Sequence, residues 1–440
     1  MNNYRNKNIV IIGLGITGMS CINFFLSRGV IPRVMDTRLD PPEKAKLPNF
    51  IECWLGSLNQ EWLLYADMII VSPGMLMHPL LIKSARTGID IISDIELFCR
   101  EACAPIIAIT GTNGKSTVSV LIGEMARSCG LITGVGGNIG LPALNLLQQS
   151  YQLYILELSS FQLEATYSLH TKVATILNIS EDHRDYYFNK FYNYKMAKLR
   201  IYEHAKVCIF NAEEKNTQPR IINYYQKTVS FGIHKGDYHL NFNNGNIWMS
   251  VNGAKILNTA ELKLIGQHNY TNILAALAMA EVIGLSNNCC LQALKNFTGL
   301  PHCFQLVWKN KGISWINDSK ATNVSSTIAA LKVSKSLVRG IIYLLVGGNS
   351  KDANLKNLSF YLQDDQLKLY CYGRDRKKFA KLRQQTSVLT TTMVDAMQDI
   401  ASKVKPGDLV LLSPACSSKD QFKDFAHRGK IFTQLAKILG

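Results

Sequence analysis

The segment AITGTNGKSTV, residues 108–118, contains a shortened form of the phosphate-binding loop. The usual loop reads G-x-x-x-x-G-K-[ST]. Gly114, Lys115 and Ser116 supply its second half, whereas the first glycine is displaced to Gly111, which leaves the tighter G-x-x-G-K-S-T. A strand is expected before this loop and a helix after it, so that backbone N–H groups at the helix N-terminus could hold a phosphate. The alternative is a glycine turn without a ligand.

Two later apolar strands also end in side chains that could do chemistry. Glu157 closes the strand LYILE, and His183 follows the strand VATIL after a short polar segment. A carboxylate at the end of a hydrophobic strand is costly unless a cation meets it. Because functional loops gather at the carboxyl ends of parallel strands, Lys115, Ser116, Glu157 and His183 should meet at one edge of a sheet.

The expected meeting point is a phosphate cradle with a magnesium site, because Mg²⁺ prefers oxygen ligands. A histidine ligand is less usual, so His183 could act near the ion without binding it. Read singly, Glu157 could be a structural hydrogen-bond acceptor and His183 a histidine in a turn. Their convergence with the glycine loop favours the phosphate site.

A second glycine-rich loop lies near the start of the chain. The segment GLGITG, with Gly13, Gly15 and Gly18, matches the G-x-G-x-x-G fingerprint, and Asp36 ends the next strand, about 20 residues further on as that fingerprint requires. The pattern favours a diphosphate ligand at the helix N-terminus. A nicotinamide dinucleotide, or packing of helix against strand without any ligand, are the alternatives.

Three strands in the last third of the chain end in similar loops. GISWIND is followed by SKAT at 319–322, IIYLLVGG by NSK at 349–351, and DLVLLSPA by CSS at 416–418. Hydroxyls and lysines gathered at one sheet edge predict an anion pocket for a carboxylate-bearing or phosphorylated ligand. Solvated turns are the alternative for any one of these loops.

The length and patterning of the chain predict several α/β domains. At 440 residues the chain exceeds what one hydrophobic core usually serves. Apolar strands alternate with amphipathic helices almost throughout, which favours mostly parallel sheets. A helix that leads into a fresh strand near residue 94, and a Gly-Leu-Pro break near residue 299, divide the chain into residues 1–93, 94–298 and 299–440.

Composition excludes several classes of protein. The net charge is +16, but the basic residues are dispersed; without a nucleic-acid-binding motif, anionic small molecules are favoured over nucleic acid. The densest basic segment, 374–383, is expected to be one solvated helix face. The 11 cysteines form no C-x-x-C pair, and the first apolar run is only strand-sized. We therefore expect a cytoplasmic protein with reduced thiols and no membrane insertion.

A series of motifs, in order along the chain, resembles those of the Mur ligase family. The motifs are TGTNGKST, ELSSFQLE, NISEDHRDYY, YKMAKLRIYEHAKVCIFN, GQHNYTNILAALA, GLPHCFQLV, INDSKATN and LLSPACSSKDQFKDFAHRG. The first motif alone is also similar to folylpolyglutamate synthases. The resemblance implies three domains: a Rossmann-like N-terminal domain for a uridine diphosphate substrate, a central P-loop-type ATPase domain, and a Rossmann-like C-terminal domain for D-glutamate.

The resemblance further implies an ATP-dependent acid–amino-acid ligase, which adds D-glutamate to UDP-N-acetylmuramoyl-L-alanine through an acyl phosphate. This reaction belongs to cytoplasmic peptidoglycan precursor synthesis, and so serves cell-wall assembly, cell shape and cell division. ATP and a pair of Mg²⁺ ions would take part, and the enzyme would act as a monomer.

Matching positions carry the site residues of the family over to this sequence. The catalytic group would comprise Lys115, Glu157, His183 and Lys198. Lys198 matches a carbamylated lysine, although the sequence alone indicates a solvated helix lysine. ATP would be bound by Gly111, Thr112, Asn113, Gly114, Lys115, Ser116, Thr117, Asn272 and Asp318. The uridine nucleotide substrate would be bound by Gly15, Thr17, Asp36, Thr37, Arg38, Gly74, Asn138, Gln162 and His183. D-Glutamate would be bound by Lys320, Thr322, Lys351, Ser418 and Phe425. Metal would be bound by Ser116, Glu157, His183 and the carbamylated form of Lys198.

The segment GLPHCFQLV departs from the family, which usually has arginine where Cys303 stands and glutamate where Gln305 stands. Because cysteine offers neither a charge nor a fork of donors to ATP, we expect a competent but weakened enzyme. Three other functions stay open: an NAD-dependent oxidoreductase that uses GLGITG, another amino-acid-adding or folate ligase of the same superfamily, and a nucleotide-binding module without chemistry. The first of these leaves the second nucleotide loop unexplained.

Overall fold

The computed structural model describes residues 4–72, 75, 80–81, 88–182, 186–187, 190–220, 225–350, 354–383 and 386–440. The chain forms two compact units. The first comprises Met1–Ile179, Tyr192–Leu262 and Asn269–Phe297, and the second comprises Ser180–Phe191, Lys263–His268 and Thr298–Gly440. Two β-sheets lie in the first unit and one in the second. Helices accompany each sheet, so the fold is α/β throughout, as the sequence predicts.

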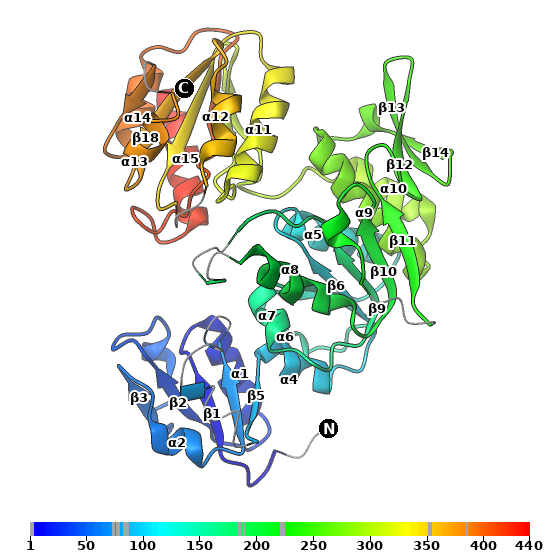
Figure 1. Ribbon diagram of the computed structural model, residues 1–440, viewed down its shortest axis with the longest axis vertical. Helices are drawn as coiled ribbons and strands as arrows, with labels where there is room; N and C mark the ends of the chain where they lie inside the picture. Colours follow the sequence, from blue (N-terminus) through cyan, green and yellow to red (C-terminus); the bar gives the residue numbers. More distant parts are fainter. Residues whose placement is uncertain are drawn as a thin grey trace. The chain divides into compact units, whose positions relative to one another are not determined.

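The first sheet is parallel and Rossmann-like, with the strand order β3–β2–β1–β4–β5. Figure 1 labels β1, β2, β3 and β5 of this sheet. Its strands are β1 (Ile9–Ile12), β2 (Arg33–Asp36), β3 (Cys53–Leu55), β4 (Met68–Val71) and β5 (Asp90–Ile92). Its helical segments are α1 (Ile16–Leu26), η1 (Lys44–Lys46) and α2 (Gln60–Leu64). The strand order reverses at β1. In open α/β sheets the ligand crevice lies at such a reversal, outside the carboxyl ends of the strands.

The second sheet has nine strands in the order β14–β13–β12–β11–β10–β9–β6–β8–β7. Its parallel strands are β6 (Ile106–Thr110), β7 (Thr133–Gly137), β8 (Leu153–Glu157), β9 (Thr171–Ile176), β10 (Ala205–Asn211) and β11 (Lys227–Phe231). The helices of this part of the chain are α4 (Asp94–Glu101), α5 (Lys115–Ser128), α6 (Ala143–Leu146), α7 (Ser160–Glu164), α8 (Phe191–Leu199), η2 (Arg200–Tyr202), η3 (Lys215–Thr217), η4 (Thr259–Glu261), α9 (Gln267–Ile283) and α10 (Asn287–Asn296). Because β6 lies between β9 and β8, the loops after these strands meet at one edge.

The remaining strands of this sheet form an antiparallel meander that the sequence analysis did not predict. They are β12 (Tyr238–Asn243), β13 (Asn246–Val251) and β14 (Ala254–Asn258). An Asn-Gly pair forms each turn: Asn244–Gly245 joins the first two strands and Asn252–Gly253 the last two, and all four residues have positive φ. Such pairs favour tight hairpins because both central residues of the turn need positive φ.

The third sheet has the strand order β15–β16–β20–β17–β18–β19, in which only the β15–β16 pair is antiparallel. Its strands are β15 (Gln305–Asn310), β16 (Ile313–Asn317), β17 (Ile342–Gly347), β18 (Leu367–Tyr372), β19 (Ser387–Leu389) and β20 (Leu409–Leu412). Its helices are α11 (Val324–Leu337), α12 (Lys356–Leu362), α13 (Arg376–Ala380), α14 (Met393–Ala401) and α15 (Phe425–Leu439).

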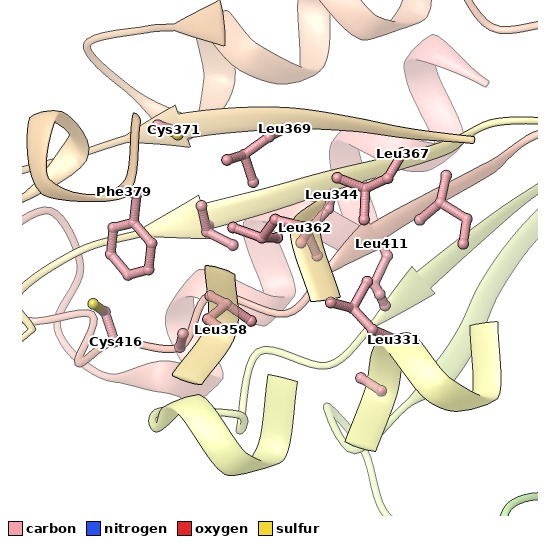
Figure 2. Close-up of a cluster of buried hydrophobic side chains, with 14 of the residues drawn as sticks. Leu331, Leu344, Leu358, Leu362, Leu367, Leu369, Cys371, Phe379, Leu411 and Cys416 are labelled. Carbon is pink, nitrogen blue, oxygen red and sulfur yellow. The ribbon is translucent and has the colours of Figure 1, made fainter. Parts of the chain in front are cut away.

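Each face of the third sheet packs against its own set of helices. On one face, Leu344 and Leu411 of the strands pack with Leu358 of α12 and Phe379 of α13 (Figure 2). On the other face, Trp315 belongs to a cluster with side chains of α14 and α15. Burial on both faces explains why the central strands are continuous apolar runs. The polar loops that follow these strands therefore start from a rigid base.

The basic segment 374–383 differs from the predicted solvated helix face. Only Arg376–Ala380 is helical, and Phe379 is fully buried in the core. Arg383 donates a hydrogen bond to the backbone carbonyl of Leu367, whereas Lys377 is exposed. Phe379 anchors the segment in the core, and only some of its basic side chains face solvent.

Asp94, the first residue of α4, is buried, and its Oδ1 finds no hydrogen-bond partner among the described residues. Burial raises the pKa of this carboxyl from its ordinary value of 3.8 to about 6. The folded protein therefore holds the proton more tightly than the unfolded chain does. Protonated Asp94 therefore stabilises the fold fully at pH values below its pKa in the unfolded chain. This stabilisation is lost as the pH rises through the pKa of Asp94 in the folded protein.

We expect Asp94→Asn to raise the free energy of unfolding by about 1–3 kcal/mol at about pH 8 and to change it little at about pH 4, because the amide stays neutral. Thermal unfolding at both pH values measures this effect. Asp40→Asn is the control, because the Asp40 side chain is 92% exposed and its substitution should change stability little at either pH. Equal melting temperatures for Asp94→Asn and the unmodified protein at the higher pH would contradict the prediction.

Candidate active site

The loop between β6 and α5 is held in a closed turn. Gly114 has φ +82°, a left-handed conformation that favours glycine. The backbone N–H groups of Thr112 and Asn113 donate to the carbonyl oxygen and to Oδ1 of Asn178, at 2.9 and 2.8 Å. Nδ2 of Asn178 returns a hydrogen bond to the Asn113 carbonyl at 3.0 Å. These hydrogen bonds fix the shape of the loop. The backbone N–H groups at the start of α5, which could bind a phosphate, come directly after it.

Two lysine ammonium groups meet one backbone carbonyl in this loop. Nζ of Lys115 donates to the carbonyls of Gly111 and Thr112, each at 2.9 Å. Nζ of Lys198 donates to the same Gly111 carbonyl at 3.0 Å and to Oγ1 of Thr110 at 3.3 Å. Lys198 is only 2% exposed, which corrects its interpretation as a solvated helix lysine. Because two cations this close repel each other, the site favours an anion.

The neighbouring Tyr194 positions Lys198. The two residues are four apart on α8, so they lie on the same face of that helix. Nζ of Lys198 is 4.7 Å from the centroid of the Tyr194 ring, an attractive cation–π contact. The Tyr194 hydroxyl in turn lies 3.1 Å from Oγ1 of Thr112. Helix α8 thus contacts the phosphate loop through both Lys198 and Tyr194.

A buried carboxylate completes this edge. Oε2 of Glu157 accepts from the Ser116 hydroxyl at 2.7 Å, and Oε1 accepts from Nδ2 of Asn138 at 2.8 Å. Glu157 is 2% exposed and pairs in register with Ile109 of β6. The structure therefore brings Lys115, Ser116 and Glu157 together as predicted.

This donor set fits a magnesium ion. A hydroxyl and a carboxylate are the hard oxygen donors that Mg²⁺ prefers, and Mg²⁺ usually takes only one or two carboxylates together with substrate phosphates. No group of three or more His, Cys, Asp or Glu side chains within the described ranges is arranged to hold a metal. The ligands would be Ser116, Glu157 and the oxygens of a bound phosphate.

Asn272 of α9 also borders the phosphate loop. It is buried, and a Cβ atom at Gly114 would lie only 2.4 Å from its Oδ1. Thr117 lies in the first turn of α5. The Oε1 atom of Gln162 accepts from the N–H and hydroxyl of Ser159 in the capping box of α7. A contact of Gln162 with a substrate stays a prediction.

The glycine fingerprint after β1 combines tight packing with an open position. A Cβ at Gly13 would lie 2.1 Å from Oγ of Ser72, and one at Gly18 would lie 1.9 Å from the Gly13 carbonyl oxygen. A Cβ at Gly15 would meet nothing within 4 Å. Two glycines therefore let the loop, strand and helix approach one another. The third leaves space at the N-terminus of α1, where Thr17 occupies the first turn.

The carboxylate of Asp36, at the end of β2, accepts hydrogen bonds from neighbouring residues. It accepts from the N–H of Leu14 at 2.7 Å and from Nε and Nη2 of Arg38 at 2.8 and 2.6 Å. Burial favours a higher pKa, but these hydrogen bonds outweigh it and hold the pKa of Asp36 below its usual value. Thr37 between the two is exposed. Asp36 therefore orients Arg38 and the fingerprint loop.

In the second unit, Asp318 organises the carboxyl edge of the third sheet. Oδ2 accepts from the Ser413 hydroxyl at 2.8 Å, and Oδ1 accepts from the N–H of Phe304 at 3.0 Å. Burial raises the pKa of Asp318 to about 7. Asp318 and Asn272 belong to different units, so the adenosine site predicted to join them stays a prediction.

Left-handed backbone conformations cluster at this edge. His302, Phe304 and Ala415 have φ values of 65°, 45° and 56°, although none is glycine. The other described non-glycine residues of this kind are three asparagines and Lys311, which lie in turns. Such a conformation costs on the order of 1 kcal/mol or more and is typical of functional sites. Cys303, the departure from the family, lies between two of these strained residues.

The residues predicted to bind D-glutamate are partly gathered here. Nζ of Lys320 lies 5.5 Å from the centroid of the Phe425 ring. Ser418 is buried in the loop before α15, whereas Thr322 is exposed. The structure thus brings Lys320 and Phe425 together. Three predicted site residues, Gly74, His183 and Lys351, lie outside the described residues.

Arg428 is a buried cation that the sequence analysis did not single out. It is 0% exposed, and its guanidinium donates to the Ser319 hydroxyl at 2.9 Å, to the Ser319 carbonyl at 2.7 Å and to the Cys416 carbonyl at 3.1 Å. It ties the loop after β16 to the loop after β20. The burial of Arg428 could have been predicted from the sequence of α15, because Phe432 and Ala436 continue the same buried stripe at four-residue spacing.

Comparison with known proteins agrees with this geometry. Residues 7–93 match the family described as Mur ligase MurD-like, N-terminal domain; residues 109–280 match the Mur ligase middle domain; and residues 302–416 match the Mur ligase, glutamate ligase domain. The UDP-N-acetylmuramoylalanine--D-glutamate ligase of Escherichia coli (strain K12) is 57% identical over 441 residues, covering 100% of both chains. The chain belongs to the Mur ligase family. The ligase of the same name from Yersinia pseudotuberculosis serotype I (strain IP32953) is 56% identical, again covering 100% of both chains.

Solved Mur ligase structures share the three-domain fold. The UDP-N-acetylmuramate-alanine ligase MurC of Thermotoga maritima has a TM-score of 0.63 at 18% identity, covering 99% of this chain and 100% of that chain. The MurF ligase of Thermotoga maritima in complex with ADP has a TM-score of 0.64 at 15% identity, covering 100% and 98%. In the part of the Mur ligase chain that the structure describes, no helix is both long and apolar enough to cross a membrane.

The close approach of Gly114 to Asn272 predicts a selective effect of one methyl group. Gly130 has nearly the same backbone, with φ +84° against +82°, but a Cβ there would meet nothing within 4 Å. We expect Gly114→Ala and Gly130→Ala each to lose about 1–2 kcal/mol of stability through the left-handed backbone. Only Gly114→Ala should also lose nucleotide affinity, by about tenfold or more, since its Cβ displaces Asn272 or the loop. Calorimetric titration with Mg·ATP measures the affinities, and equal affinities for the two variants would contradict the account of the loop.

Proposed function

We propose that this Mur ligase is an ATP-dependent acid–amino-acid ligase that adds D-glutamate to UDP-N-acetylmuramoyl-L-alanine, in peptidoglycan precursor synthesis. The observation that carries the proposal is the convergence of Lys115, Lys198, Ser116 and Glu157 at the glycine loop between β6 and α5. Relatives that span the full length and bear the name of this activity support it. The structure of the related MurF ligase in complex with ADP supports the use of an adenine nucleotide. Cytoplasmic location and a monomeric state stay predictions.

The chemistry requires activation of a carboxylate, because a carboxylate is a poor electrophile until it gains a good leaving group. We propose that the alanine carboxylate takes the terminal phosphoryl group of ATP, and that the amine of D-glutamate then attacks the acyl phosphate and expels phosphate. Lys115 would hold the phosphates, since its ammonium lies at the loop and can follow the developing charge. A magnesium ion bound by Ser116 and Glu157 would neutralise phosphate charge at the same place.

Lys198 is proposed to act as a carbamate. Its ammonium group would lose a proton, and the neutral amine would then add CO₂ and release a second proton, which converts a buried cation into a carbamate anion. That change would remove the repulsion between Lys198 and Lys115 and leave an ion pair over the Gly111 carbonyl. Lys198 is buried and contacts the Gly111 carbonyl, so its carbamate would lie at the phosphate loop.

The two outer domains would supply the substrates. The open position at Gly15 and the N-terminus of α1 suit the diphosphate of the uridine nucleotide, with Thr17, Thr37 and Arg38 as further contacts and Asn138 of the central domain as another. Lys320 and Phe425, with the buried Ser418, would receive D-glutamate. The lysine supplies the positive charge that a dicarboxylate requires.

Phosphate release from Mg·ATP tests the proposal, with UDP-N-acetylmuramoyl-L-alanine and D-glutamate added singly and together. We expect sustained release only when both are present, and none when L-glutamate replaces D-glutamate. Binding of ATP without release under any condition would favour a nucleotide-binding module without chemistry. Release with another amino acid in place of D-glutamate would indicate another ligase of the family.

Because Cys303 stands where the family usually has arginine, we expect that a substitution at this position can increase the activity of the enzyme. Cys303 occupies the strained turn beside Asp318, and its N–H donates to the Leu300 carbonyl at 3.2 Å. A charge-assisted hydrogen bond from arginine contributes about 1.5–3 kcal/mol, so Cys303→Arg should lower KM for ATP or raise kcat by roughly 10- to 100-fold. Steady-state kinetics at varied ATP measures this change. The control is Cys103→Arg, at an exposed cysteine, which should leave both constants unchanged; no difference between the two variants would contradict the prediction.

A further inference from the structure

Three cysteines meet where helix α5 ends and helix α10 begins. Cys129 is the residue that follows α5, and Cys289 and Cys290 lie in the first turn and a half of α10. The two helices pack against each other, and both are labelled in Figure 1. The thiols of Cys289 and Cys290 are close enough to Cys129 to change its pKa. Its Sγ also lies 3.8 Å from the carbonyl oxygen of Ser286, the residue before α10.

The three thiols differ in exposure. Cys129 and Cys289 are partly exposed, whereas Cys290 is 1% exposed. Burial raises the pKa of Cys290 to about 12, so this thiol keeps its proton and is shielded from solvent. The two partly exposed thiols are therefore the pair that a reagent in solution can reach.

The thiol cluster is remote from the phosphate loop. Cys129 lies at the opposite end of α5 from Lys115, about 20 Å away at the rise of an α-helix. None of the three cysteines is among the residues that line the candidate active site. The cluster nevertheless joins α5, which begins at the loop, to α10, which follows α9, the helix that carries Asn272.

We propose that Cys129 and Cys289 form a reversible disulfide when the protein meets a hydroperoxide, and that this site cross-links α5 to α10. The Cys289 thiolate attacks the peroxide oxygen, which gives a sulfenic acid and releases an alcohol or water. The Cys129 thiol then displaces water from the sulfenic acid and forms the S–S bond. Two thiols are oxidised to one disulfide, and one peroxide is reduced by two electrons.

The cross-link would stabilise the first unit without changing its contacts. Cys129 and Cys289 are far apart in the sequence, so a bond between them restricts the unfolded chain over a long loop. In the folded chain α5 and α10 already pack against each other, and Cys129 Sγ lies 3.8 Å from the carbonyl oxygen that precedes α10, so the bond would join neighbouring segments. We therefore expect the melting temperature of the oxidised protein to rise by about 5 °C.

The full-length protein is treated with hydrogen peroxide, its remaining thiols are blocked with N-ethylmaleimide, and its peptides are mapped by mass spectrometry. We expect a linked pair of peptides that contain Cys129 and Cys289, a mass loss of two hydrogen atoms and the higher melting temperature, all reversed by dithiothreitol. Cys129→Ser and Cys289→Ser should each abolish the link and the shift. Cys103→Ser, at an exposed cysteine outside the cluster, should keep both.

Mapping of the unmodified chain keeps the test independent of how the variants fold. Oxidation that leaves Cys129 and Cys289 as separate blocked thiols would overturn the proposal. So would a disulfide that joins other cysteines, or a link whose loss in Cys129→Ser leaves the shift in melting temperature intact.

Discussion

Two ammonium groups share one backbone oxygen, the carbonyl of Gly111, and the surrounding structure of the central sheet is arranged to hold them there. Lys115 reaches it from the start of α5, and Lys198 reaches it from α8. Neighbouring cations of this kind are stable only where an anion or a compensating carboxylate is close. The contact therefore favours an anion at the loop, and the buried Glu157 ends the adjacent strand β8.

The strand order provides this arrangement. Because β6 is flanked by β9 and β8, the loop after β6 receives Asn178 from one side and Glu157 from the other. The third sheet repeats the design with different groups. Its central strands end beside Asp318 and Arg428, and Arg428 links the loops after β16 and β20. In both units an apolar sheet, buried on both faces, carries buried charges at its carboxyl edge.

Much of this arrangement could be predicted from local sequence. Glu157 stands at the end of an apolar strand, and the glycine loop stands between a strand and a helix, so parallel pairing was enough to bring them together. The Asn-Gly turns of the β12–β14 meander could also have been predicted from the sequence. They were missed because strands and helices alternate elsewhere in the chain. The buried stripe of α15 gave a similar signal for Arg428.

Other features depend on contacts that are distant in sequence. Lys198 sits in a polar helical segment, and nothing local distinguishes it from a solvated lysine; its burial follows from packing against the phosphate loop. Gln162 shows the opposite case, because a residue matched to substrate binding makes its hydrogen bonds within the cap of its own helix. Family resemblance assigns a role to a position, whereas only the packing shows which atoms are already occupied.

The central claim is that the phosphate site activates a carboxylate. The most direct test labels the alanine carboxylate of UDP-N-acetylmuramoyl-L-alanine with the heavy isotope of oxygen and follows the label by mass spectrometry through one turnover with Mg·ATP and D-glutamate. The account predicts that one labelled oxygen appears in the released phosphate and the other in the new amide. Release of unlabelled phosphate alongside amide formation would contradict it.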